Sequence, residues 1–171
     1  MKKLLIVVDM QKDFIDGALG TPEAAAVVPK VREKILSCPA GNVYATMDTH
    51  GADYLSTQEG RRLPVVHCVR GTGGWALHPD IAPLIRQDRI YEKPSFGSVR
   101  LAEALAALPE TEEIELVGLC TDICVVSNAL LLKAFLPETT IAVDSACCAG
   151  VTPEKHLAAL ETLRSCQVEV R

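Results

Sequence analysis

The sequence has no apolar run of the roughly 18 residues that a membrane-spanning helix needs. A short apolar run follows two lysines at the start of the chain, but it stops at Asp9, too early for a secretion signal. The net charge of -5 makes nucleic acid and anionic membranes poor partners. We therefore expect a cytoplasmic protein that binds neither nucleic acid nor membrane.

Pairs of cysteines separated by two residues are also absent. Without such a pair, the seven cysteines do not indicate a zinc ribbon or a thioredoxin-like redox motif. A disulfide framework belongs to an oxidising compartment, and the sequence shows no secretion signal. Most of the thiols are therefore expected to be free. Cys147 and Cys148 are expected to be packing or loop residues.

The composition indicates one globular domain. Hydrophobic residues make up 49% and charged residues 23% of the 171 positions, which is typical of a compact protein. A chain of this length can bury a proper core, and no repeat, low-complexity tract or linker interrupts it. We predict a single domain over residues 1–171.

Apolar runs rich in β-branched residues alternate with patterns typical of helices. Strands are predicted over residues 4–9, 42–48, 63–68, 89–93, 113–119 and 139–144, with 167–170 as a candidate edge strand. Helices are predicted over residues 22–37, 98–109, 123–137 and 152–165, with Pro29 as the candidate first turn of the first and Thr152 and Pro153 opening the last. The alternation predicts an α/β fold, namely a three-layer, doubly wound, mostly parallel six-stranded sheet with helices on both faces.

Polar side chains gather where the predicted strands end. Ligands of open α/β sheets bind beyond the carboxyl ends of the strands. The candidate residues at that edge are Asp9, Asp48, His50, His67, Lys93 and Cys124. Each alone has an ordinary alternative, because aspartates cap turns and cysteines fill cores. Together they favour a functional site.

Cys124 stands at the predicted start of a helix, where unpaired N–H groups and the helix dipole lower the pKa of a thiol. Lys93 would add a positive charge, and Asp9 can accept the thiol proton and deliver it to a leaving amine. The backbone N–H groups between Cys120 and Cys124 can hold an oxyanion. This combination predicts acyl transfer, most simply amide hydrolysis.

A second group of residues suggests a metal site. Asp48 and His50 form a D-x-H pair at one strand end, and His67 ends the next predicted strand. One carboxylate and two imidazoles suit zinc, iron or manganese. Glu59 lies in the intervening loop and could add a fourth ligand or hold a bound water.

Five motifs resemble those of the isochorismatase-like cysteine hydrolases: DMQKDF (9–14), MDTH (47–50), HCVRGT (67–72), EKPSFGS (92–98) and GLCTDICV (118–125). They follow one another in order over nearly the whole chain. Within that superfamily, the metal residues point to nicotinamidases, also called pyrazinamidases, because isochorismatases proper lack the metal site. The resemblance implies a metal-dependent, homo-oligomeric enzyme of NAD salvage that deamidates nicotinamide and pyrazinamide through a thioester.

The resemblance also implies roles for individual residues. The catalytic triad would be Asp9, Lys93 and Cys124. The amides of Cys120 and Cys124 would form the oxyanion hole, next to a cis peptide bond between Leu119 and Cys120.

The substrate and metal sites follow in the same way. Phe14 would stack on the substrate ring, and Trp75, the only tryptophan, would bind substrate in the pocket. The metal, expected to be zinc with iron or manganese as alternatives, would be held by Asp48, His50, Glu59 and His67.

Three alternatives stay open. The first is another amidase of the superfamily, acting on a ureido or carbamoyl substrate. The second is a non-catalytic protein on this fold, against which the intact triad argues. The third is a redox-sensing protein, because Cys120 stands four residues from Cys124 at a position where the family often has alanine.

Overall fold

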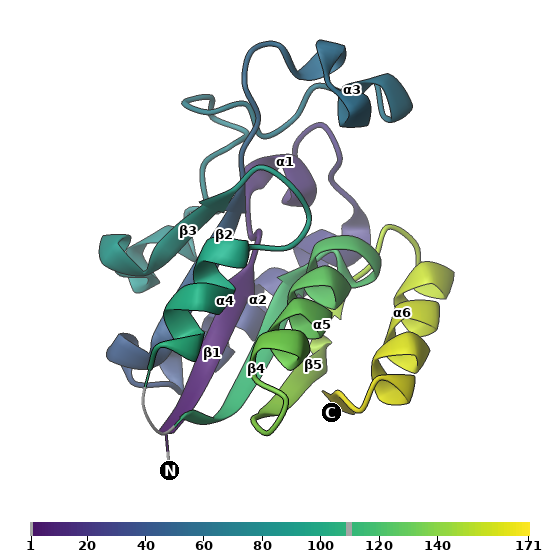
Figure 1. Cartoon of the computed structure of the whole chain (residues 1–171). Coiled ribbons are helices and arrows are strands. Elements are labelled where there is room, and N and C mark those ends of the chain that lie inside the picture. The colour runs from purple at the N-terminus through teal and green to yellow at the C-terminus, as the bar shows by residue number, and fades with distance from the viewer. Residues whose placement is uncertain (1, 109–110) are drawn as a thin grey trace.

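The computed structural model describes residues 2–108 and 111–171, which are built around one six-stranded sheet (Figure 1). The strands are β1 (Lys2–Val8), β2 (Val43–Asp48), β3 (Ile90–Lys93), β4 (Thr111–Leu119), β5 (Thr140–Ala149) and β6 (Glu169–Val170). Their order is β3-β2-β1-β4-β5-β6, and every neighbouring pair is parallel. The predicted doubly wound α/β fold is confirmed, and the winding reverses between β1 and β4.

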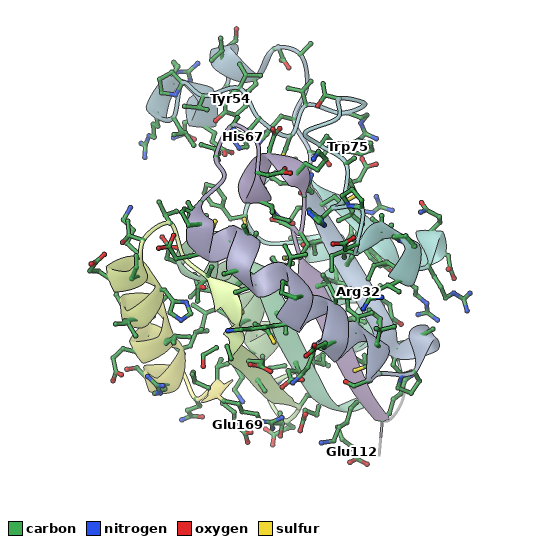
Figure 2. All side chains as sticks on the ribbon, turned by 180° about the vertical axis from the view of Figure 1, so that it is seen from behind. Arg32, Tyr54, His67, Trp75, Glu112 and Glu169 are labelled. Atoms are coloured by element: carbon green, nitrogen blue, oxygen red, sulfur yellow. The ribbon has the colours of Figure 1, made fainter. Side chains whose placement is uncertain are left out.

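Helices cover both faces of the sheet. They are α1 (Lys12–Ile15), α2 (Pro22–Leu36), α3 (Gln58–Arg62), α4 (Val99–Ala106), α5 (Val126–Phe135) and α6 (Pro153–Ser165). The last three lie on one face, whereas α2 crosses the other, where Figure 2 shows it in front. The short helices α1 and α3 stand beyond the carboxyl ends of the strands, and α3 belongs to the lobe at the top of Figure 1.

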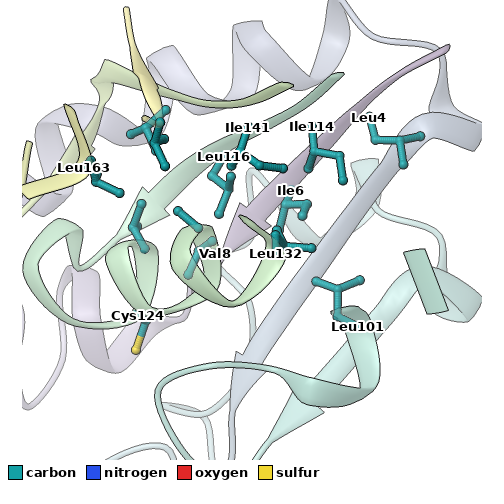
Figure 3. Packing of buried hydrophobic residues seen from close by; sticks show 14 of the residues in the cluster. Leu4, Ile6, Val8, Leu101, Ile114, Leu116, Cys124, Leu132, Ile141 and Leu163 are labelled. Atoms are coloured by element: carbon teal, nitrogen blue, oxygen red, sulfur yellow. The ribbon is translucent and has the colours of Figure 1, made fainter. Parts of the chain in front are cut away.

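The pattern of β1 explains the two helical layers. Its side chains alternate between an apolar cluster under α4, α5 and α6 and a second cluster under α2. The first cluster takes Leu4, Ile6 and Val8, and the second takes Leu5 and Val7. Figure 3 shows the first cluster, which Cys124 joins from the turn after β4.

The predicted strand over residues 63–68 is not part of the sheet. The segment has no regular secondary structure, because Pro64 has no N–H for a strand ladder, Val66 is 51% exposed and Cys68 has a φ of 46°. It runs past the end of β2 instead, where the His50 N–H donates to the Cys68 carbonyl at 2.9 Å. The sixth strand is the candidate edge strand, observed as β6 beside β5.

The helix starts were predicted with mixed success. α6 begins at Pro153 with Thr152 as its N-cap, as predicted. The first turn of α2 is not at Pro29, which lies inside the helix. The helix starts at Pro22, because the Thr21 hydroxyl caps it there and a first-turn proline loses no hydrogen bond.

The ends of other helices and strands differ slightly from the predicted ones. β5 continues to Ala149, so Cys147 and Cys148 are buried strand residues and the packing role is the right one. The predicted helix 98–109 is α4 with Ser98 as N-cap, and Pro109 lies outside the described residues. Across the described part of the chain, none of the helices combines the length and apolarity needed to cross a bilayer.

Candidate active site

The predicted site residues converge at the carboxyl edge of the sheet, around the reversal between β1 and β4. Asp9 follows β1, Asp48 ends β2, Lys93 ends β3, and Cys124 lies in the turn after β4. Parallel pairing sets Asp48 directly opposite Lys93. Ligands of doubly wound sheets bind at such a reversal, so the topology itself brings these side chains together.

Asp9, Lys93 and Cys124 form one buried group. Lys93 Nζ lies 2.7 Å from Asp9 Oδ2 and donates to Cys124 Sγ at 3.4 Å. The other Asp9 oxygen accepts a 2.6 Å hydrogen bond from the Thr46 hydroxyl. Asp9 is 0%, Lys93 1% and Cys124 5% exposed. A lysine at this depth requires such partners, because an isolated buried charge is very unfavourable.

Burial controls the protonation of this group. It raises the pKa of Asp9, against the opposing charge of Lys93. It also raises the pKa of the Cys124 thiol well above its usual value, and the Asp9 carboxylate adds to that rise. Burial opposes the charge of Lys93, but Asp9, Cys124 and Asp48 outweigh it and raise the pKa of the lysine.

These directions correct one expectation from the sequence. A helix start was expected to lower the pKa of Cys124 and give a thiolate. Desolvation of the buried sulfur and the neighbouring carboxylate outweigh that effect. A raised pKa favours the thiol over the thiolate, so attack by Cys124 would require a base close by.

The turn that carries Cys124 is wider than the predicted regular helix. Thr121–Val125 is a π-helical turn in which the Val125 N–H donates to the Cys120 carbonyl at 3.0 Å, and α5 begins after it. Such turns are frequent at functional sites. The peptide bond between Leu119 and Cys120 is cis, as the family resemblance implied.

A glycine allows this turn to approach β1. Gly118 has a φ of 116°, and a side chain there would collide with the carbonyl group of Val8. Asp9, the residue after Val8, also has a positive φ, 47°. The close approach of the two strand ends brings the turn that carries Cys124 next to Asp9.

A second cluster, the metal-ligand candidates, lies beside this group. Each of its four residues offers one ligand atom, and these atoms lie within 4.8 Å of one another: Asp48, His50, Glu59 and His67. Asp48 Oδ2 lies 2.9 Å from His50 Nε2 and 3.7 Å from His67 Nε2. Glu59 Oε1 lies 3.7 Å and 3.9 Å from the same two nitrogens. The structure thus brings together all four residues predicted from the sequence.

The cluster fits a divalent metal ion. Buried His50 Nε2 has no hydrogen-bond partner among the described residues, which is unfavourable unless a ligand occupies its lone pair. His67 Nδ1 lies 2.7 Å from the Val65 carbonyl, which assigns the proton to Nδ1 and leaves Nε2 as a donor to a metal. Two imidazoles with two carboxylates suit zinc, iron or manganese.

Two residues in and beside α1, to which the sequence analysis gave no role in the site, form hydrogen bonds with the backbone at or next to the metal-ligand candidates. Fully buried Gln11 donates to the carbonyl of Asp48 at 2.9 Å and accepts from its N–H at 2.7 Å. Asp13 Oδ2 accepts from the N–H of Cys68, next to His67, at 2.7 Å. Both supporting residues belong to the DMQKDF motif, which was the available signal.

Asp48 joins the two clusters. Its Oδ1 lies 3.4 Å from Lys93 Nζ, while Oδ2 faces His50. Burial would raise the pKa of Asp48, but the neighbouring imidazoles of His50 and His67 and the charge of Lys93 hold it well below the usual range. The carboxylate therefore stays ionised, as a metal ligand must.

One cavity of about 690 Å³ opens onto both clusters. Cys120 and Cys124 line one part of it, and all four metal-ligand candidates line another. Phe14 also lines the cavity, with its ring 5.6 Å from the ring of His67. Phe14 therefore stands where a substrate ring could lie against it.

Trp75 is the one predicted site residue that the structure places elsewhere. It is not among the described residues that line the cavity. Its indole N–H donates to the Thr49 hydroxyl at 2.9 Å, and its carbonyl accepts from Gln11 at 2.8 Å. Figure 2 shows it apart from His67, on the outer side of the upper loops. These contacts support the neighbouring residues, and binding of a substrate by Trp75 stays a prediction.

The fold and the site together define a class of protein: a hydrolase on a doubly wound parallel sheet, with cysteine, carboxylate and lysine at its carboxyl edge beside a candidate metal site. Comparison with known families agrees. The isochorismatase domain matches residues 3–171, and the chain belongs to the isochorismatase family.

Three relatives span most of this chain. The nicotinamidase/pyrazinamidase of Mycobacterium tuberculosis is 27% identical over 183 residues, 98% of this chain and 97% of the relative. Streptothricin hydrolase of Streptomyces noursei is 31% identical over 127 residues, 73% of this chain but 42% of the relative. The solved structure of the pyrazinamidase of Pyrococcus horikoshii in complex with zinc has a TM-score of 0.85 at 28% identity, covering 100% of this chain and 99% of that one.

Proposed function

We propose that this chain is a metal-dependent cysteine amidohydrolase that deamidates nicotinamide and pyrazinamide to the acid and ammonia. The observation that carries the proposal is the shared cavity. The buried cysteine group and the metal-ligand candidates both open onto it, and Asp48 connects them. Similarity to the Mycobacterium tuberculosis and Pyrococcus horikoshii enzymes supports the same substrates.

The first half-reaction forms a thioester and releases ammonia. Cys124 Sγ attacks the amide carbon while its proton passes to Asp9, and the carbonyl electron pair moves onto oxygen. Collapse of this adduct breaks the C–N bond, and Asp9 returns the proton to the departing nitrogen. The raised pKa of Asp9 suits a group that must both take and give a proton. Lys93 balances the negative charge throughout.

The second half-reaction consumes water. Asp9 takes a proton from the water as its oxygen attacks the thioester carbon. The C–S bond breaks, the sulfur recovers the proton, and the carboxylic acid leaves. In both halves negative charge develops on the former carbonyl oxygen. The N–H groups of Cys120 and Cys124 are the proposed donors to it.

Substrate orientation falls to the opposite part of the cavity. Phe14 offers an aromatic face for the substrate ring, at the edge of the metal-ligand candidates. Asp48, His50, Glu59 and His67 would hold the divalent ion, with zinc the proposed metal. When bound, the ion supplies a Lewis acid for a lone pair of the substrate.

A larger amide is the second candidate substrate. The cavity volume falls within the range of sites for drug-sized ligands, which a single-ring amide fills only in part. The chain is also similar to streptothricin hydrolase over 73% of its length. Redox sensing has less support, because burial raises the pKa of Cys120 to about 12 and that of Cys124 also rises, whereas sensor thiols are acidic and exposed.

The decisive test is ammonia release from nicotinamide by the wild type and by Cys124→Ala, with metal analysis of the purified protein. The proposal expects activity that is lost in the variant and about one metal ion per chain. Metal without activity would move the test to a panel of larger amides, including streptothricin. Neither metal nor activity would refute the metal-dependent reaction and favour a metal-free amidase.

The cellular context is part of the same proposal. We place the enzyme in NAD salvage in the cytoplasm, as a homo-oligomer, in line with the family resemblance. Size-exclusion chromatography with light scattering tests the oligomeric state, and a single-chain mass in solution would refute it.

A further inference from the structure

Asn128 is a buried polar side chain that the proposed reaction does not use. It lies on α5, one turn after Cys124, and is 2% exposed. Its Oδ1 accepts from the N–H of Ser98 at 2.9 Å. Its Nδ2 donates to the carbonyl of Phe96 at 3.0 Å and to the carbonyl of Cys124 at 2.7 Å. All three bonds go to backbone groups.

These backbone groups belong to two different parts of the active site. Residues 96–98 follow Lys93, whose ammonium group itself donates to the Ser95 carbonyl at 3.1 Å. The turn that carries Cys124 comes from the other side of the sheet reversal. A side chain at Gly97 would press on α5, so this loop lies close against the helix. The Asn128 amide therefore ties the lysine loop to the nucleophile turn.

The hydrogen-bond pattern requires an amide. On this side-chain frame only asparagine offers one acceptor and two donors. An aspartate of the same shape would still accept from Ser98 but would place an oxygen against two carbonyl oxygens. A leucine would remove the side-chain partner of all three backbone groups, of which the Ser98 N–H and the Cys124 carbonyl are buried. The neighbouring buried positions on α5, Ala129 and Leu132, are apolar, so packing alone gives no reason for a polar residue here.

We propose that Asn128 is a positioning residue that holds the Cys124 sulfur and the Lys93 ammonium at their 3.4 Å separation. The inference rests on the proposed role of Cys124 as nucleophile and not on which amide is the substrate. Asn128 is not itself a lining residue of the cavity, and it contacts Phe96 and Cys124, which do line it, through their backbone carbonyls, so it acts through the two segments that it joins. A misplacement of about 1 Å at an active site can lower the rate about 100-fold.

The test compares Asn128→Asp with Leu132→Ala, a control that weakens the same helix at another buried position without touching either segment. Three quantities are measured: kcat and KM for nicotinamide, the alkylation rate of Cys124 by iodoacetamide, followed by peptide mass spectrometry, and Tm. We expect Asn128→Asp to lower kcat about 100-fold with KM nearly unchanged, and to slow alkylation. Leu132→Ala should lower Tm and keep both rates within about threefold.

Several results would overturn the inference. One is a folded Asn128→Asp enzyme with kcat and alkylation rate near those of the wild type. Another is an equal loss of kcat in the two variants at equal Tm, which would make Asn128 merely structural. If Asn128→Asp does not fold, Asn128→Ser, which leaves room for a bridging water, is judged by the same criteria.

The design separates this inference from the choice of substrate. A wild type that alkylates at Cys124 but releases no ammonia from nicotinamide would contradict the substrate alone, and the alkylation ratio would then decide on Asn128. Amide hydrolysis that persists in Cys124→Ala would overturn both the nucleophile and the role of Asn128.

Discussion

Two lysines of this protein each hold a pair of carboxylates, in different parts of the sheet. Lys93 contacts Asp9 and Asp48 at the carboxyl edge, and its side chain is fully buried. Lys34 of α2 contacts Glu115 at 2.9 Å and Asp144 at 2.8 Å, with 26% of its side chain exposed. The chemistry is the same, but of the two only Lys93 also reaches a sulfur, that of Cys124, which lines the cavity.

The difference teaches what sets the ion pair of the proposed active site apart from a structural one. The Lys34 cluster fastens α2 to β4 and β5, and solvent reaches it, so it acts as an ordinary tether. The Lys93 cluster is held away from water, where every charge changes the protonation of its neighbours. The two clusters therefore differ in their burial and in the cysteine sulfur next to Lys93, and not in the pairing of charges itself.

The largest effect is expected for Lys93→Met. It leaves Asp9 as a buried charge without its partner, which destabilises by about 3–5 kcal/mol. It also removes the cation from the reaction, so kcat should fall at least about 1,000-fold. Steady-state kinetics and chemical denaturation measure the two effects. Lys34→Met is the matched control, and a similar fall in kcat there would erase the distinction between the lysines.

The second effect concerns metal binding. Gln11→Ala removes the two hydrogen bonds that fix the backbone of Asp48. Loss of such outer support lowers metal affinity about 10–100-fold. Competition between the protein and a chromophoric chelator measures the affinity for zinc without any assay of activity. Unchanged affinity in Gln11→Ala would show that Asp48 is positioned by the sheet alone.

A smaller effect is expected at Thr46. Its hydroxyl stabilises the ionised form of Asp9, so Thr46→Val should raise the pKa of Asp9 further. The acid limb of the kcat/KM profile should then move to higher pH, and kcat should fall about tenfold. Thr46→Ser, which restores the hydroxyl, should restore the profile. A profile that does not move would exclude Thr46 as a support of the base.

The smallest effect is the stability lost in Lys34→Met, about 1 kcal/mol or less for a partly exposed cluster. Partial burial opposes the ionisation of Asp144, but the hydrogen bond and charge of Lys34 outweigh it and lower its pKa. A lowered carboxyl pKa stabilises the fold above the unfolded value of about 3.9 and loses that contribution as pH falls. The difference in free energy of unfolding between wild type and variant should therefore shrink below about pH 4. A constant difference across pH would contradict the ion-pair origin.

The sequence was most informative where side-chain chemistry and strand ends coincide. Asp9, Asp48 and Lys93 could be placed because parallel strands bring their carboxyl ends to one edge. The strand predicted over residues 63–68 was wrong. Its apolar residues resemble those of a strand, but Pro64 and the exposed Val66 do not fit a position inside the sheet. His67 in this segment nevertheless lies beside Asp48 and His50, because the segment runs past the end of β2.

Supporting contacts could not be predicted in the same way. Gln11 and Asn128 form hydrogen bonds with backbone groups of residues that are distant in sequence. The residues around them in the sequence do not indicate which groups these are. Trp75 was assigned to the pocket from the family resemblance, whereas in the structure its indole N–H donates to the Thr49 hydroxyl. The protonation of Cys124 was also missed, because burial of a single sulfur is a property of the finished fold.

The reversal between β1 and β4 has a kinetic consequence. The two strands that meet there are separated by most of the first two-thirds of the chain, and the reactive thiol enters the site only when they pair. Contacts this distant along a chain form late, since their loop-closure entropy must be overcome first. During refolding, recovery of amide-hydrolysing activity should therefore lag behind the return of helical circular dichroism, because Cys124 and Lys93 meet only after the sheet is assembled.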